Sequence, residues 1–165
     1  MAGVSSEGGR WPLWWPDRAL EIADGIVEAA ERAAAGDAEG FEDEITGMAA
    51  LPHGQPVTAL SGIVTELFEA AHPDGIGADD VRAILERTVA GAQWYRGDLV
   101  GPLVVVLTGA LGSAPEDAPP VPEFERIAAA VLAAATLASR ARVPLTVVVR
   151  SALAEIARAE TVESP

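Results

Sequence analysis

The chain has 165 residues and a formal net charge of −14, and half of its residues are hydrophobic. A chain of this length and composition is expected to fold as one domain around a sizeable core. It contains no cysteine, which excludes disulfides, thiolate nucleophiles and cysteine-ligated zinc. The first ten residues are polar and lack the pattern of a signal peptide. We therefore expect a cytoplasmic protein.

The negative charge is concentrated in the first half of the chain. Residues 1–82 hold 16 acids and 4 arginines, whereas residues 83–165 hold 9 acids and 7 arginines. Such a charge distribution repels nucleic acids and anionic lipid surfaces. The longest apolar stretches, Leu99–Leu111 and Ile127–Ala138, are shorter than the ~18–20 residues that a bilayer requires. We expect neither a nucleic acid nor a membrane as partner.

The N-terminal segment, residues 1–15, is expected to be disordered or weakly ordered. Residues 1–10 are rich in glycine and serine, and prolines bracket the tryptophans that follow. A first helix should begin at Pro16 or Asp17, because proline suits the first helical position and an acid suits the positive end of the helix dipole. Apolar residues then recur every three or four positions up to Gly36, a helix stop.

The rest of the chain predicts six further helices in a single all-α domain that spans residues 16–160, with a frayed C-terminus over 161–165. The expected ranges are 37–50, 56–71, 79–92, 101–112, 122–141 and 143–160. Two β-branched runs, Val104–Val106 and Val147–Val149, have high strand propensity, but each follows a proline at an expected helix start. The expected fold is therefore an all-α bundle of six to seven helices.

An internal similarity suggests an alternative arrangement of the same helices. Residues 102–112 align without gaps to residues 144–154, with six of eleven positions identical at an offset of 42, and Pro56 opens another apolar helix 46 residues before Pro102. A period of 42–46 residues is typical of helical-hairpin repeats, which would make residues 37–71, 79–112 and 122–160 an array of three αα-hairpins. Because helices rich in alanine, valine and leucine resemble one another by composition, we prefer a compact bundle.

One pair of residues has the spacing of a metal-binding motif. Glu69 and His72 form a Glu-x-x-His pair, as in di-iron helical bundles. Such a site needs a second Glu-x-x-His pair, and the only other histidine, His53, has no glutamate three residues before it. His72 precedes a proline at an expected helix end, where a histidine interacts favourably with the dipole. We expect no metal and no other cofactor.

Catalytic candidates are equally sparse. The adjacent acids Asp43/Glu44 and Asp79/Asp80 could act in acid–base chemistry. However, Asp79/Asp80 opens a helix, where acids are stabilising, and Asp43/Glu44 lies on an acidic helix that is expected to be solvated. No Gly-x-Ser-x-Gly sequence and no phosphate-binding fingerprint is present. The sequence predicts no catalytic residue, which disfavours an enzyme.

The aromatic residues are the candidate binding residues. Trp11, Trp14 and Trp15 fall within five positions, and tryptophan is enriched at binding hot spots. Alternatively, these side chains fold back onto the bundle and close its open end. Trp94 and Tyr95 lie between two expected helices, where they either pack beneath the turn or line a cleft.

Three of the expected helices are so apolar that they compete for the centre of the domain. Leu103–Leu111 and Ile127–Ala138 contain no charge, and the helix over 143–160 is apolar around most of its circumference. A helix of this kind must be buried on nearly every side, and a seven-helix protein has room for one or two at its centre. At least one is therefore expected to face another subunit, and a twofold dimer is the commonest arrangement.

This reasoning predicts a non-enzymatic helical protein–protein interaction module that self-associates as a homodimer or binds another protein. The alternative is a small-molecule-binding helical domain. Its apolar pocket would be lined by Trp94, Tyr95 and the helix over 101–112, and its ligand would be a small apolar molecule.

Overall fold

The computed structural model describes residues 10–113 and 120–163, and within these ranges the secondary structure consists of helices joined by turns and loops, with no strand. The expected all-α fold is thus confirmed, and both valine runs are helical, in α6 and α8. The helices are α2 (Asp17–Ala34), α3 (Ala38–Ala49), the 3-10 turn η1 (Pro52–Gly54), α4 (Gln55–Ala71), α5 (Ala78–Gly91), α6 (Val100–Ala110), α7 (Glu123–Ala141) and α8 (Leu145–Glu163). None of the helices in the described ranges is long and apolar enough to cross a bilayer.

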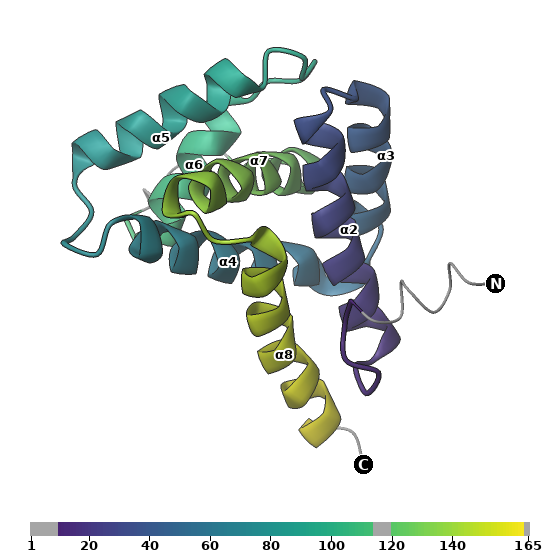
Figure 1. Ribbon diagram of the computed structural model, residues 1–165. Helices are drawn as coiled ribbons and strands as arrows, with labels where there is room; N and C mark the ends of the chain where they lie inside the picture. Colours follow the sequence, from purple (N-terminus) through teal and green to yellow (C-terminus); the bar gives the residue numbers. More distant parts are fainter. Residues whose placement is uncertain (1–9, 114–119, 164–165) are drawn as a thin grey trace.

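Helix α7 forms the centre of the bundle (Figure 1). It packs against α2, α3, α4, α5, α6 and α8. Every residue from Ile127 to Ala134 is buried, as are Leu137 and Ala138. Most of these side chains are alanine, which lets neighbouring helices approach closely because interaxial distance depends on the side chains at the contact.

Helices α6 and α8, the other two apolar helices, lie at the periphery. On α6, Leu103 and Leu107 are fully buried, but Val100 and Val104 are 51% and 40% exposed. On α8, Val149 and the buried residues after it face the bundle, whereas Val147 is 52% exposed. Of the three apolar helices, α7 alone is surrounded by other helices on most of its sides in the described part of the chain.

The helices do not form the alternative array of three hairpins. In an array, each hairpin contacts only its neighbours, whereas here α7 contacts every other long helix. Helix α3 packs mainly against α2 and α7 rather than α4, and α8 runs away from α7 after their connection (Figure 1). Residues 102–112 and 144–154, although similar in sequence, therefore contact different sets of helices.

The N-terminal residues that the structure describes contact the bundle. Residues 10–15, which were expected to be weakly ordered, pack against the bundle because Trp11 and Trp15 are buried. Residues 1–9 lie outside the described residues. At the other end, α8 is helical to Glu163, and the fraying expected over residues 161–165 stays a prediction.

Candidate functional site

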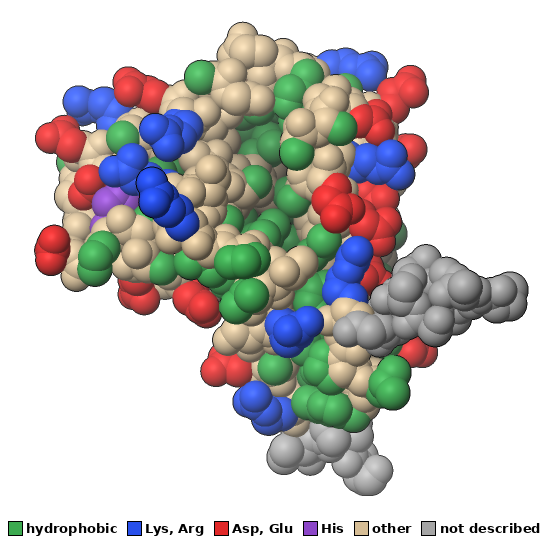
Figure 2. Space-filling model, viewed as in Figure 1, with side chains coloured by type: hydrophobic (Ala, Val, Ile, Leu, Met, Phe, Trp, Pro, Cys, Tyr) green, Lys and Arg blue, Asp and Glu red, His purple; other side chains and the backbone are tan. Residues whose placement is uncertain are grey.

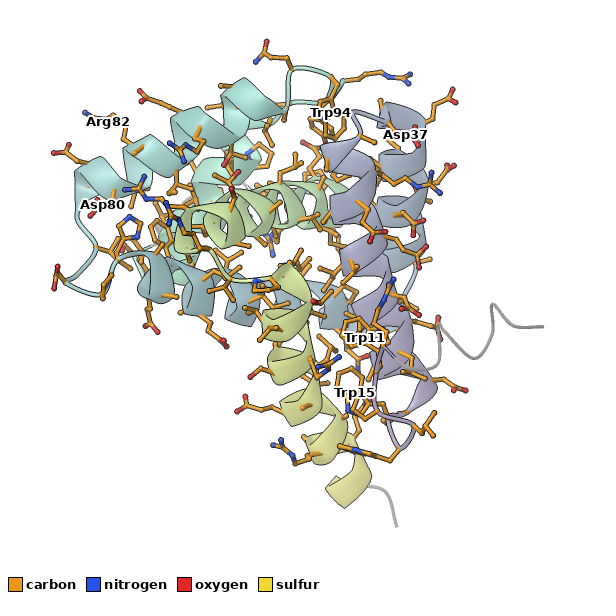
Figure 3. All side chains as sticks on the ribbon, viewed as in Figure 1. Trp11, Trp15, Asp37, Asp80, Arg82 and Trp94 are labelled. Carbon is orange, nitrogen blue, oxygen red and sulfur yellow. The ribbon has the colours of Figure 1, made fainter. Side chains whose placement is uncertain are left out.

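Two of the three N-terminal tryptophans form a buried pair between α2 and α8 (Figure 3). The rings of Trp11 and Trp15 are stacked, with centroids 5.7 Å apart and planes inclined by 12°. The indole N–H of Trp11 donates a hydrogen bond of 2.7 Å to Oδ1 of Asp24 on α2. This pair therefore packs within the chain and fastens the N-terminal segment to the bundle.

The same segment connects α8 to α2. Nη2 of Arg150 on α8 donates a 2.7 Å hydrogen bond to the carbonyl oxygen of Arg10, and its guanidinium lies 5.9 Å from the Trp11 ring centroid. Trp14 is 53% exposed, and its neighbour Leu13 is 91% exposed. Of the three N-terminal tryptophans, Trp14 is thus the one that remains open to another molecule.

Trp94 and Tyr95 pack on Phe41, a residue that the sequence did not single out. Both rings meet Phe41 edge to face, with centroids 5.1 Å away for Trp94 and 5.9 Å away for Tyr95. Phe41 is fully buried on α3, and its position in the helical period of residues 38–49 is the signal that could have found it. Partial burial raises the pKa of the Tyr95 hydroxyl, and nearby acids raise it further, Glu125 most.

Trp94 also lines an open groove between α2, α5 and α7 with a volume of about 280 Å³. Figure 2 shows hydrophobic side chains inside this hollow. A polar contact crosses its wall, because the hydroxyls of Thr88 on α5 and Thr136 on α7 lie 2.9 Å apart. Of the residues expected to line an apolar pocket, Trp94 lines this groove, whereas Tyr95 and α6 do not, and most of its other walls are small residues of α2, α5 and α7.

A second groove of about 280 Å³ lies between α4, α6 and α7. Its lining residues are Val57 and Ser61 of α4, Val105, Val106 and Gly109 of α6, and Arg126 and Ala130 of α7. Nε of Arg126 is buried there with no hydrogen-bond partner among the described residues. The groove thus combines apolar walls with an arginine that has no ion-pair partner among the described residues, a combination that the sequence did not predict.

The outer side of α6 borders this second groove. We call this outer side the α6 face. It consists of Val100, Gly101, Val104, Val105, Thr108 and Gly109, which are exposed or half-buried. None of these residues is charged, in a protein whose net charge is −14. The face is therefore suited to contact with an apolar surface.

His72 ends α4 through local contacts. Nδ1 of its ring lies 3.0 Å from the carbonyl oxygen of Phe68, and Nε2 lies 3.6 Å from Oδ1 of Asp80. Asp80 in turn accepts a 2.8 Å hydrogen bond from the backbone N–H of Gly77 at the start of α5. Within the described ranges, no group of three or more histidine, cysteine or acidic side chains could hold a metal ion. His72 and Asp80 have the contacts of helix-capping residues.

Two glutamates face each other between α2 and α3. Burial raises the pKa of the Glu44 carboxyl above its usual value of 4.5, and Glu28 raises it further by repulsion and by a hydrogen bond. Arg32 lowers the pKa of Glu44, but by less than the repulsion from Glu28 raises it. The folded protein therefore binds a proton at Glu44 more tightly than the unfolded chain does.

We expect the stability of the protein to depend on pH through Glu44. Because its pKa is raised in the folded state, the stabilisation is complete below pH 4.5 and is lost as the pH rises through the folded-state pKa. Glu44→Gln should therefore unfold at a higher urea concentration than the wild type at pH 7. Its midpoint should also change less between pH 7 and pH 5.

Glu86→Gln is the matched control, since it removes the same charge from an exposed position on α5. Its urea midpoint should keep the pH dependence of the wild type. If the two variants have the same pH dependence, Glu44 is not responsible for it.

Comparisons of this chain with protein-family models, with curated proteins and with solved structures find no match. Functional conclusions must therefore rest on the chain's own surfaces. These surfaces are the two grooves, the exposed Leu13 and Trp14, and the α6 face.

Proposed function

We propose that this protein is a non-enzymatic helical interaction module whose partner is a second copy of the same chain. The observation that carries this proposal is the α6 face, an uncharged helix side with half-exposed valines at Val100 and Val104. Single exposed hydrophobic residues are common on protein surfaces, but two valines one turn apart on an uncharged helix form a continuous apolar strip.

The charge distribution supports association at this place. A dimer brings together two chains of net charge −14, and their repulsion opposes contact between the acidic first halves. Helix α6 belongs to residues 83–165, where 9 acids and 7 arginines nearly cancel. The α6 face is therefore a position at which two copies can meet with little electrostatic cost.

We expect sedimentation or light scattering to give a mass near twice 17.0 kDa for the wild type. Val104→Glu should weaken self-association by about 100-fold, because a twofold interface would bury the new carboxylate in both copies and a cost of about 1.4 kcal/mol at each position corresponds to tenfold. Val104 is exposed in the single chain, so the variant should keep the helical circular dichroism of the wild type.

Val147→Glu is the matched control, because it makes the same change at an exposed valine on α8, the other peripheral apolar helix. Its dissociation constant should equal that of the wild type. If Val147→Glu dissociates the dimer and Val104→Glu does not, the contact lies on α8 and the assignment to α6 is wrong. A monodisperse wild-type monomer at high micromolar concentration would overturn self-association altogether.

A second candidate function is the binding of a small apolar molecule in the groove between α2, α5 and α7. The observation that favours it is Trp94, a large aromatic side chain that lines a groove of about 280 Å³, close to the lower end of the range for ligand pockets. The groove is open to solvent rather than enclosed (Figure 2), which favours the interaction module. A monomeric wild type would make this groove the better candidate.

A further inference from the structure

The α6 face has a pattern that is symmetric along the helix. Gly101, Val105 and Gly109 recur every four residues, which places them on one side of α6. A Cβ atom at Gly109 would meet no atom within 4 Å, so the space beside this residue is open. A twofold interface brings the same surface of both copies together. Two α6 helices that cross antiparallel at Val105 therefore place Gly101 of one copy against Gly109 of the partner subunit.

Close approach at the glycines alone does not make a stable dimer. Helix α6 has 11 residues and is roughly 16 Å long, whereas a stable interface buries about 800 Å² on each partner. The second groove extends the α6 face, since Val105 and Gly109 belong to both. The surface available to a second copy thus includes parts of α4 and α7.

The groove holds a donor that lacks an acceptor. Nε of Arg126 is buried without a hydrogen-bond partner, and its guanidinium forms no ion pair with any described carboxylate. A buried donor without an acceptor is unfavourable, and an arginine in this state is best satisfied by a carboxylate. Arg126 shares the groove with Gly109, near the C-terminal end of α6.

A free carboxylate lies at the other end of the same helix. Asp98 is exposed just before α6, and it forms no ion pair or hydrogen bond within the described part of the chain. Val100, the first residue of α6, lies roughly 8 Å along the helix axis from Val105, and Asp98 comes two residues before it, whereas Gly109 lies roughly 6 Å on the other side of Val105. Antiparallel crossing at Val105 therefore brings Asp98 just past the partner's Gly109.

We propose that a second copy docks antiparallel on the α6 face and that Asp98 enters the partner's groove between α4, α6 and α7 to pair with the partner's Arg126. Twofold symmetry makes two such ion pairs in each dimer. This inference rests on the proposed self-association and adds its orientation, its register and its charge contacts.

Charge exchange tests this arrangement directly. Asp98→Arg and Arg126→Asp should each weaken self-association at least 10-fold in sedimentation equilibrium, because each variant alone places two like charges in contact at two symmetric positions. An equimolar mixture of the two single variants should form a dimer again, because both contacts in the mixed dimer join opposite charges. The double variant D98R/R126D should also self-associate within a few-fold of the wild type.

Glu86→Arg makes the same charge change as Asp98→Arg at an exposed site on α5, and it should leave the dissociation constant of the wild type unchanged. Asp98 is exposed, so Asp98→Arg should keep the wild-type fold. Asp98→Arg therefore tests the proposed ion pair even if Arg126→Asp does not fold.

If Asp98→Arg self-associates as the wild type does, the ion pair is absent and the inference is overturned. If both single variants fold and dissociate but their mixture remains monomeric, the inference is overturned as well. Dissociation by Val104→Glu would still support the proposed function in either case. A monomeric wild type would overturn both the proposed self-association and this inference.

Discussion

Replacing Phe41 by alanine is expected to lower the free energy of unfolding by about 3–5 kcal/mol, which is a large part of the 5–15 kcal/mol typical of a single domain. Phe41 is fully buried, and its ring supports both Trp94 and Tyr95 edge to face. The substitution leaves a cavity beneath two aromatic rings, so the intrinsic fluorescence of the folded protein should change too. Urea unfolding at one fixed protein concentration measures the loss, because self-association makes stability depend on concentration.

Phe124→Ala provides the comparison, since it is the same chemical change at a half-buried position in the first turn of α7. The loss of stability should be clearly smaller there. A loss of less than about 1 kcal/mol for Phe41→Ala would contradict the role of Phe41 as the support of the Trp94–Tyr95 pair.

Replacing Trp11 by alanine is the second change with a large expected effect, also about 3–5 kcal/mol. The indole stacks on Trp15, donates a hydrogen bond to Asp24 and lies beneath the guanidinium of Arg150. Because Arg150 belongs to α8, amide hydrogen exchange in α8 should accelerate more than exchange in α7. Trp11→Phe keeps an aromatic ring but removes the donor, and it should cost about 1 kcal/mol.

Trp14→Ala is the matched control for Trp11→Ala, because Trp14 is more than half exposed. Its stability should stay within about 0.5 kcal/mol of the wild type. Equal losses of stability for Trp11→Ala and Trp14→Ala would show that the N-terminal segment does not pack as described. A change in mass for Trp14→Ala, with Val104→Glu still dimeric, would place the dimer contact at the exposed tryptophan.

Local sequence features were sufficient to locate the helices. Proline near the start of a helix, glycine after its end and apolar residues every three or four positions are effects of neighbouring residues on one another. They placed α2, α4 and α7 within one or two residues of their observed bounds. The same features indicated helices at both valine runs, because each run follows a proline and continues with helical spacing.

The candidate site was predicted only in part. The aromatic residues stood out by their type, but their type did not reveal that Trp11 and Trp15 are buried while Trp14 is exposed. That difference depends on α8, which approaches the N-terminal segment from more than 130 positions away along the chain. Arg126, which has no ion-pair partner among the described residues, was missed for the same reason, since its place in a groove depends on how α4 and α6 pack beside α7.

Composition determined that three helices of this chain are too apolar to be solvated, and the spacing of prolines and glycines determined where they run. Only the tertiary structure decided which of the three is central. Leu103–Leu111 and Ile127–Ala138 are both uncharged, so hydrophobicity does not distinguish them. The size of their side chains does distinguish them. Helix α7 carries alanine on most of its sides, so that neighbouring helices can pack closely around it. Helix α6 carries valines and leucines, and it packs on one side and leaves Val100 and Val104 exposed.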